Sequence, residues 1–181
     1  MPIYTRTGDT GTTGTATGKR VLKSSLEIEV GGCIDELSTF LGLARVGQTD
    51  ETIKSQLLDV QKSLLVLGSD VAIGTSQLSA ADVKQIEQAI DQYSQIVPPL
   101  REFVIPGDNH ASATLHVART VCRRTERILV QFNEMRKAES QPFLSPCIMQ
   151  FLNRLSDLLF VFARVTGGES FAGESKSYIK I

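Results

Sequence analysis

Apolar residues recur every three or four positions along most of the chain, which is the spacing of amphipathic helices. Residues 26–45 show the pattern clearly, with Ile34, Leu37 and Leu41 on one face. The same spacing continues over residues 51–72, 79–97, 109–132 and 147–165. The pattern therefore predicts an all-α fold, built as a five-helix bundle.

Residues that start and stop helices stand between these stretches. Ser79 is a good N-cap, Ser145 is followed by proline at the first helical position, and Pro98-Pro99 ends the third stretch. With 181 residues, the chain is long enough for one domain. We divide it into residues 1–23, a helical bundle over residues 24–166, and a small polar tail over residues 167–181 that we expect to be mobile.

The N-terminal segment cannot build a core. Residues 4–23 hold seven threonines and four glycines and end in Lys19, Arg20 and Lys23. The glycine spacing fits neither the Walker loop nor the dinucleotide fingerprint. Backbone amides, hydroxyls and cations together still suit a polyphosphate, and Asp9 is placed to help hold Mg²⁺. We predict a flexible nucleotide-binding loop; a disordered tail is the alternative.

The fourth predicted helix carries a basic stripe beside its apolar face. At about 100° per residue, Arg119, Arg123 and Glu126 fall within about 60° of one another, whereas Arg124 is about 100° from Arg123. Guanidinium groups one turn apart suit a phosphate clamp. The alternative is an ordinary solvated charged face.

The fifth predicted helix is apolar nearly all round. Phe160 and Val161 lie off its main apolar face, and Asn153, Asp157 and Arg164 form a separate polar stripe. Such a helix is usually buried on more than one side, and a lone bundle would leave Phe160 and Val161 exposed. We therefore predict a subunit interface with a site beside it. The alternative is a large core helix with a few satisfied polar groups.

The composition argues against several classes of function. The formal net charge is −1, which gives no global field for nucleic acid or an anionic membrane. The three cysteines, Cys33, Cys122 and Cys147, form no metal-binding or disulfide pattern. Charged residues interrupt the most apolar stretch, which argues against a transmembrane helix. We expect a soluble cytoplasmic protein that binds neither nucleic acid nor membrane.

Five segments, taken in order, resemble the PduO-type ATP:cob(I)alamin adenosyltransferases. They are "YTRTGDTGTT…GKRVLK", "IDELSTFLGLAR", "FVIPG", "LHVARTVCRRTER" and "FLNRLSDLLFVFAR". The resemblance implies a homotrimer of five-helix bundles of ferritin-like topology, with active sites between subunits. It also implies transfer of the adenosyl group of ATP to the cobalt of a reduced corrinoid such as cob(I)alamin, with release of triphosphate and with Mg²⁺.

The resemblance also implies roles for individual residues. Arg123 matches the arginine that grips ATP phosphate, Glu126 and Asn153 lie beside the nucleotide, and Phe103 matches the aromatic residue under the cobalt. Asp35 and Arg119 match an intersubunit salt bridge near the corrin. The nucleotide loop comprises Thr5, Thr7, Gly8, Asp9, Gly11, Thr12, Thr13, Lys19, Arg20 and Lys23. The chain departs from the usual family residues at Gly31, Cys33, Ser38 and Asp108.

The chemistry agrees with this assignment, because cob(I)alamin is itself a nucleophile and the protein need not supply one. We assign no protein metal site. Neither His110 nor His116 has a glutamate three residues before it, as a di-metal ferritin-like bundle requires. A non-catalytic ATP-binding or corrinoid-carrier bundle stays open. A flavin-dependent reductase and a B12-dependent enzyme are the expected protein partners.

Overall fold

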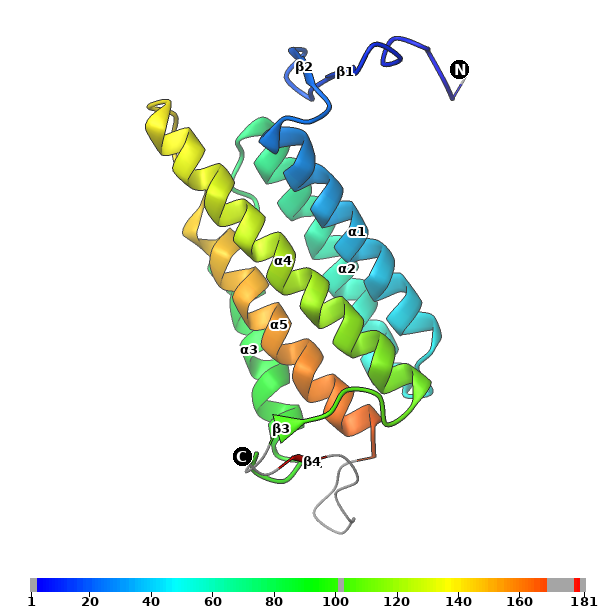
Figure 1. Ribbon diagram of the computed structural model, residues 1–181. Helices are drawn as coiled ribbons and strands as arrows, with labels where there is room; N and C mark the ends of the chain where they lie inside the picture. The colour runs from blue at the N-terminus through cyan, green and yellow to red at the C-terminus, as the bar shows by residue number, and fades with distance from the viewer. Residues whose placement is uncertain (1–2, 101–102, 169–177, 180–181) are drawn as a thin grey trace.

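The computed structural model describes residues 3–100, 103–168 and 178–179, and within them five helices dominate (Figure 1). α1 packs against α2 and α4, and α5 packs against α4 and α3, which makes an elongated bundle. The predicted all-α five-helix fold is confirmed. The helices are α1 Leu26–Val46, α2 Glu51–Ile73, α3 Ala80–Ser94, α4 His110–Ala138 and α5 Pro146–Thr166.

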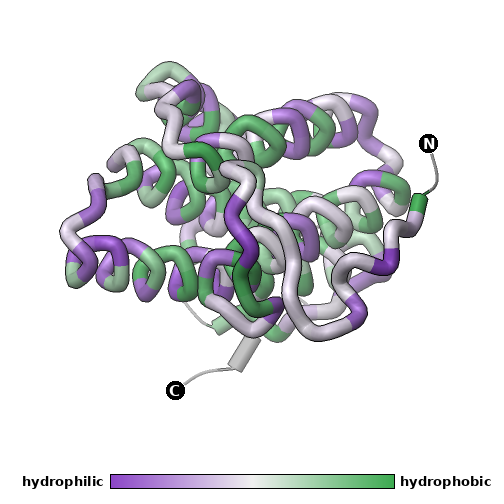
Figure 2. The backbone as a smooth tube through the Cα atoms, turned by 90° about the horizontal axis from the view of Figure 1, so that it is seen from above, coloured by the Kyte–Doolittle hydropathy of each residue, from purple (hydrophilic) through white to green (hydrophobic). Residues whose placement is uncertain are grey.

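The apolar positions found in the sequence meet in one core. Leu37, Leu41, Leu115, Leu152 and Leu159 are fully buried. Each buried leucine contributes about 1.5–3 kcal/mol relative to an exposed one. Hydrophobic and hydrophilic positions interleave along the helices, as expected when one face of each helix is buried (Figure 2).

The predicted start signals act as expected at two helices. Ser79 and Asp82 form a capping box at the start of α3. At the start of α5, Ser145 is the N-cap, Pro146 is the first helical residue, and the Cys147 amide donates a hydrogen bond to the Ser145 hydroxyl. Two predicted ends differ from the structure. α3 ends at Ser94, before Val97, and α4 continues beyond Phe132 to Ala138.

Two short antiparallel strand pairs lie outside the bundle. β1 (Thr12–Gly14) pairs with β2 (Arg20–Leu22), which makes the predicted nucleotide loop a hairpin. β3 (Phe103–Val104) pairs with β4 (Tyr178–Ile179), so two residues of the predicted tail lie beside the segment before α4. Residues 169–177 and 180–181 of that tail lie outside the described residues.

Asp70 is a buried carboxylate that holds the connection between α2 and α3. It is fully buried and accepts hydrogen bonds from the Gln77 amide (2.9 Å), the Leu78 amide (2.8 Å) and the Thr75 hydroxyl (2.5 Å). Burial alone would raise the pKa of Asp70, but these hydrogen bonds outweigh it and hold the pKa below its ordinary value. The charged form is therefore the one that stabilises the fold.

We expect Asp70→Asn to lower the free energy of unfolding at neutral pH by about 1.5–3 kcal/mol, because three hydrogen bonds to a charge are weakened or lost. The contribution of Asp70 is complete above the ordinary aspartate pKa of about 4 and is lost as pH falls through the lower native pKa. Urea unfolding at pH 7 and across the acid range tests this. A stability difference that does not shrink as pH falls would contradict the assignment.

Candidate functional site

Glu126 and Asn153 meet across the contact between α4 and α5. The Asn153 amide nitrogen donates a hydrogen bond to Glu126 Oε1 at 3.2 Å, and both residues are half-buried. The resemblance predicts both beside the nucleotide, and the fold brings them together. Their amide and carboxylate groups offer the donors and acceptors that a nucleoside needs.

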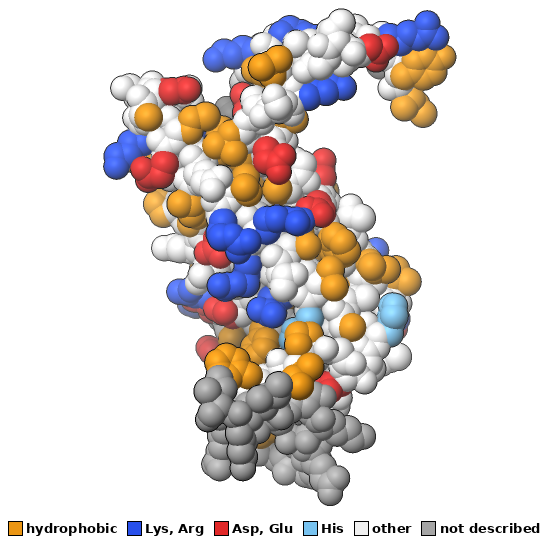
Figure 3. Space-filling view, viewed as in Figure 1, with side chains coloured by type: hydrophobic (Ala, Val, Ile, Leu, Met, Phe, Trp, Pro, Cys, Tyr) orange, Lys and Arg blue, Asp and Glu red, His pale blue; other side chains and the backbone are white. Residues whose placement is uncertain are grey.

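The two neighbouring arginines of α4 have different surroundings. Arg124 forms an ion pair with Glu36 of α1. Arg123 is exposed and, within the part of the chain that the structure describes, makes no hydrogen bond or ion pair. Basic side chains gather over the middle of the α4 face (Figure 3). Arg123 is therefore the arginine of this pair whose guanidinium is available to an anion.

Arg119 lies one turn before Arg123 and is held by an aromatic ring. Its guanidinium carbon is 5.7 Å from the centroid of the Phe160 ring, and that of Arg164 is 5.9 Å from the same centroid. Burial, followed by repulsion from Arg123, lowers the pKa of Arg119 from its ordinary value. Arg119 Nε is buried and has no hydrogen-bond partner among the described residues. A carboxylate beside it would relieve both costs.

One argument for a subunit interface on α5 is wrong. We expected a lone bundle to leave Phe160 and Val161 exposed, but Val161 is only 7% exposed and belongs to the core. Phe160 is half-buried and packs against the two guanidiniums and, edge-on, against His116. The α5 surface therefore gives no independent indication of assembly, because neighbours within the chain already cover these two residues.

Asp35 has surroundings different from those of Arg119. It is exposed and lines a groove of about 240 Å³ between α1 and α2, together with Gly31 and Ser38. Arg119 packs instead on Phe160 of α5. The two charges form no ion pair among the described residues, so the pairing of Asp35 with Arg119 between subunits stays a prediction.

Phe103 stands in β3, just before the turn into α4. Its side chain is 66% exposed, a large apolar surface to leave in water. Gly107 has φ 121°, a left-handed conformation that favours glycine, and it turns the chain toward α4. The segment thus presents an aromatic ring at the end of the bundle where α4, the helix of Arg119 and Arg123, begins (Figure 1).

The N-terminal hairpin is held mainly by its own backbone and by Arg20. Arg20 Nη2 donates to the Thr7 carbonyl at 2.6 Å and also to the Thr12 hydroxyl. Gly18, with φ 82°, closes the turn through a bond from its amide to the Thr15 carbonyl. Lys19, Lys23 and Asp9 are exposed. Of the predicted cations, the two lysines remain available to phosphate while Arg20 supports the hairpin.

We expect the segment Thr5 to Lys23 to exchange its amide hydrogens rapidly without nucleotide and more slowly with Mg-ATP. Its side chains are mostly exposed, so few apolar contacts oppose local opening, whereas bound phosphate would engage its amides and lysines. Hydrogen exchange followed by mass spectrometry, with and without Mg-ATP, measures this. Slow exchange of equal rate in both states would show that the segment is already rigid and gains nothing from nucleotide.

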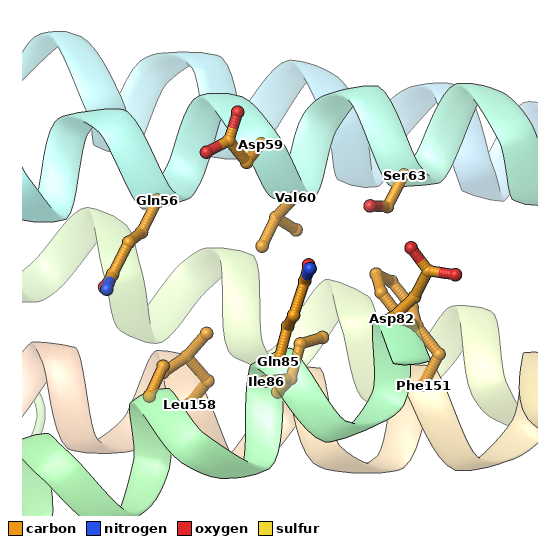
Figure 4. A pocket seen from close by; sticks show the side chains of 10 residues that line it. Gln56, Asp59, Val60, Ser63, Asp82, Gln85, Ile86, Phe151 and Leu158 are labelled. Atoms are coloured by element: carbon orange, nitrogen blue, oxygen red, sulfur yellow. The ribbon is translucent and has the colours of Figure 1, made fainter. Parts of the chain in front are cut away.

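A separate pocket of about 150 Å³ lies between α2, α3 and α5 (Figure 4). Gln56, Asp59, Asp82 and Gln85 line it with polar groups, and Phe151 lies among its apolar residues. It contains none of the predicted site residues. Among the described helices, none combines the length and apolarity that a membrane span requires.

Comparison with known proteins identifies the family. A family model described as cobalamin adenosyltransferase matches residues 3–166. The chain belongs to the cobalamin adenosyltransferase family. A cobalamin adenosyltransferase from Cupriavidus metallidurans is 42% identical over 165 residues, covering 90% of this chain and 86% of that protein. The human corrinoid adenosyltransferase MMAB is 35% identical, covering 98% of this chain and 73% of its own.

A solved cobalamin adenosyltransferase structure supports the fold assignment. It is a phenylalanine-to-alanine variant of a PduO-type ATP:corrinoid adenosyltransferase from Lactobacillus reuteri, complexed with cobalamin and ATP. It is 28% identical to this chain, with a TM-score of 0.82, and the match covers 92% of this chain and 94% of that one. The likeness extends over nearly the whole chain, so the bundle and its appended loops belong to one shared architecture.

Sequence reasoning missed one group beside the predicted site of this adenosyltransferase. Arg154 donates hydrogen bonds both to Asn153 and to Glu87 of α3. No periodicity or motif signals such a contact, because it depends on how α3 lies against α5. The one feature of the sequence that could have pointed to Arg154 is its place directly after Asn153, a predicted nucleotide-binding residue.

Proposed function

We propose that this protein transfers the 5′-deoxyadenosyl group of ATP to the cobalt of cob(I)alamin or a related reduced corrinoid, releasing triphosphate. The observation that carries this is the contact between Glu126 of α4 and Asn153 of α5, in a chain that matches the family from residue 3 to residue 166. Arg123, on the same helix as Glu126, has no hydrogen-bond or ion-pair partner among the described residues. The relatives named as corrinoid adenosyltransferases and the neighbour complexed with cobalamin and ATP support the same activity.

In this reaction the protein positions the two substrates and stabilises the charge of the leaving triphosphate. The reduced cobalt is the nucleophile, it attacks the 5′ carbon of ATP, and the bond from that carbon to the triphosphate oxygen breaks. Arg123 would neutralise charge on the leaving triphosphate, as oriented donors do at developing anions. Glu126 and Asn153 would hold the nucleoside so that its 5′ carbon faces the metal.

We propose that one complete site needs two copies of the chain, assembled as a homotrimer. The hairpin with Thr7, Lys19 and Lys23 lies beyond one end of the bundle, whereas Arg123 is near the middle of α4 (Figure 1). A neighbouring copy would bring its hairpin over Arg123. The same assembly would place Asp35 of one copy beside Arg119 of the next, which satisfies the desolvated guanidinium.

Phe103 is proposed to cover the lower face of the cobalt. An exposed phenyl ring cannot coordinate a metal, so it would keep water or a base ligand away from that position. A corrinoid without a lower ligand is easier to reduce to the nucleophilic state. This use also explains why a large apolar side chain is left in water in the free protein.

The residues present are compatible with Mg²⁺ if the phosphates of ATP supply most of its ligands. In the described portion of the chain, no three His, Cys, Asp or Glu side chains gather as a metal cluster. Mg²⁺ is commonly held by one or two carboxylates together with nucleotide phosphates, and exposed Asp9 is suited to that arrangement. When bound, the ion would neutralise triphosphate charge.

We propose that the protein works in a reducing compartment, the cytoplasm. Cys33 and Cys122 are buried thiols, and Cys147 is a half-buried one. The reaction consumes cobalt in the cob(I) state, one electron more reduced than cob(II), so a reductase must supply the substrate. We propose that this reductase is flavin-dependent. An enzyme that uses adenosylcobalamin must accept the product.

The competing function is a non-catalytic bundle that carries ATP or corrinoid. Phosphorus NMR of the protein with ATP, Mg²⁺ and chemically reduced cobalamin separates the two. A transferase releases one intact triphosphate for each corrinoid consumed. Binding of both ligands without any triphosphate would instead support the carrier.

A further inference from the structure

A run of hydrogen bonds crosses three helices and ends at the proposed nucleotide site. Arg154 Nε donates to Glu87 Oε1 at 3.1 Å, which joins α5 to α3. Arg154 Nη1 donates to Asn153 Oδ1 at 2.5 Å. The Asn153 amide nitrogen then donates to Glu126 Oε1 at 3.2 Å, which joins α5 to α4.

The order of donors and acceptors in this run determines the orientation of the Asn153 side-chain amide. An asparagine side chain has almost the same shape in two orientations that exchange its oxygen and nitrogen. A guanidinium only donates and an ionised carboxylate only accepts. The amide oxygen must therefore face Arg154 and the amide nitrogen must face Glu126. The opposite orientation would set two donors against each other on one side and two acceptors on the other.

Arg154 in turn needs Glu87. Its side chain is 40% exposed and that of Glu87 is 46% exposed, so an unpaired arginine would move freely into solvent. The ion pair holds the Nε edge against α3, which leaves Nη1 directed at Asn153. An ion pair this exposed contributes little to folding stability. Its geometry therefore matters more than its strength.

We propose that Arg154 and Glu87 are positioning residues for ATP. They hold the Asn153 amide in one orientation and, through it, the Glu126 carboxylate, without touching the nucleotide themselves. The inference rests on the proposed function, since it takes Asn153 and Glu126 to be the groups that contact ATP.

The first test removes each partner while keeping the fold. We expect Glu87→Gln and Arg154→Met each to raise the KM for ATP about three- to tenfold, the cost of one misplaced hydrogen bond. The KM for corrinoid and the melting temperature should change little. Asp59→Asn is the matched control, because it breaks an exposed ion pair to Lys62 that lies within α2 and includes no residue of this run. It should leave both KM values unchanged.

The second test reverses the ion pair. The double variant Glu87→Arg, Arg154→Glu keeps opposite charges between α3 and α5, but it places an acceptor beside Asn153 instead of a donor. We expect its melting temperature to stay close to that of the unmodified protein while the KM for ATP is at least tenfold raised. ATP binding measured by calorimetry, without corrinoid, should show the same loss.

Recovery of ATP binding in the reversed pair would overturn the inference, since it would show that Arg154 and Glu87 act only by joining two helices. Equal rises in both KM values would overturn it too. Unchanged ATP binding in all three variants of an active enzyme would reject the inference and leave the proposed function standing. Failure of the unmodified protein to bind ATP would reject the proposed function itself.

Discussion

Replacing Arg123 with alanine is expected to lower kcat/KM for ATP about 10- to 150-fold without unfolding the protein. The guanidinium is exposed and has no partner among the described residues, so its removal leaves no buried charge behind. A charge-assisted hydrogen bond to phosphate contributes about 1.5–3 kcal/mol, which gives this range. Steady-state kinetics with ATP varied at saturating reduced corrinoid measure it, and circular dichroism confirms the fold.

Arg124→Ala is the matched control for Arg123→Ala. Arg124 is the next residue on the same helix, but Glu36 already engages its guanidinium. We expect its loss to cost at most about 1 kcal/mol of stability, as for other exposed ion pairs, with a small effect on ATP kinetics. If the two variants show equally mild losses, the α4 stripe is an ordinary solvated surface and the phosphate assignment fails.

Reversing the charge of Asp35 is expected to raise the KM for corrinoid more than tenfold. In the proposed trimer, Asp35→Arg would face Arg119 of the neighbouring copy, and like charges at a partly desolvated contact repel strongly. Adding Arg119→Asp should recover part of the loss. Recovery should be incomplete, because a short carboxylate cannot reproduce the stacking of the guanidinium on Phe160.

The assembly itself must be measured beside these variants. Light scattering at micromolar concentration should give three times the chain mass for the unmodified protein and a smaller mass for Asp35→Arg. Arg119 is one turn from Arg123, so the KM for ATP should be recorded separately for each variant. A monomer that transfers adenosyl groups at full rate would contradict the shared site and the Asp35–Arg119 pairing together.

The sequence predicted the bundle well because helix formation depends on local signals. The spacing of Ile34, Leu37 and Leu41 requires one buried face, and the Ser145–Pro146 pair determines where α5 begins. The extension of α4 to Ala138 was missed because residues 133–138 are mostly polar and hide the apolar spacing. Met135 still packs against the core there.

The features that the sequence did not predict depend on contacts between distant segments, which the spacing of apolar residues along one helix does not encode. The β3–β4 pairing joins residues on either side of α4 and α5. Val161 is buried by its position on α5, although a helical wheel places it off the main apolar face. Glu126 and Asn153 were found through the resemblance, and only the fold brought them to 3.2 Å of one another. The Glu87–Arg154 bridge was found only in the fold.

Formation of a cobalt–carbon bond from ATP by this chain can be followed in the visible absorption spectrum. Reduced cobalamin is incubated anaerobically with Mg-ATP and the protein, and the absorption of cob(I)alamin is followed with time. We expect the cob(I)alamin absorption to disappear and that of adenosylcobalamin to appear; light should then cleave this product to a cob(III) species in air. Persistence of the cob(I)alamin spectrum despite bound ATP would contradict the proposed transfer.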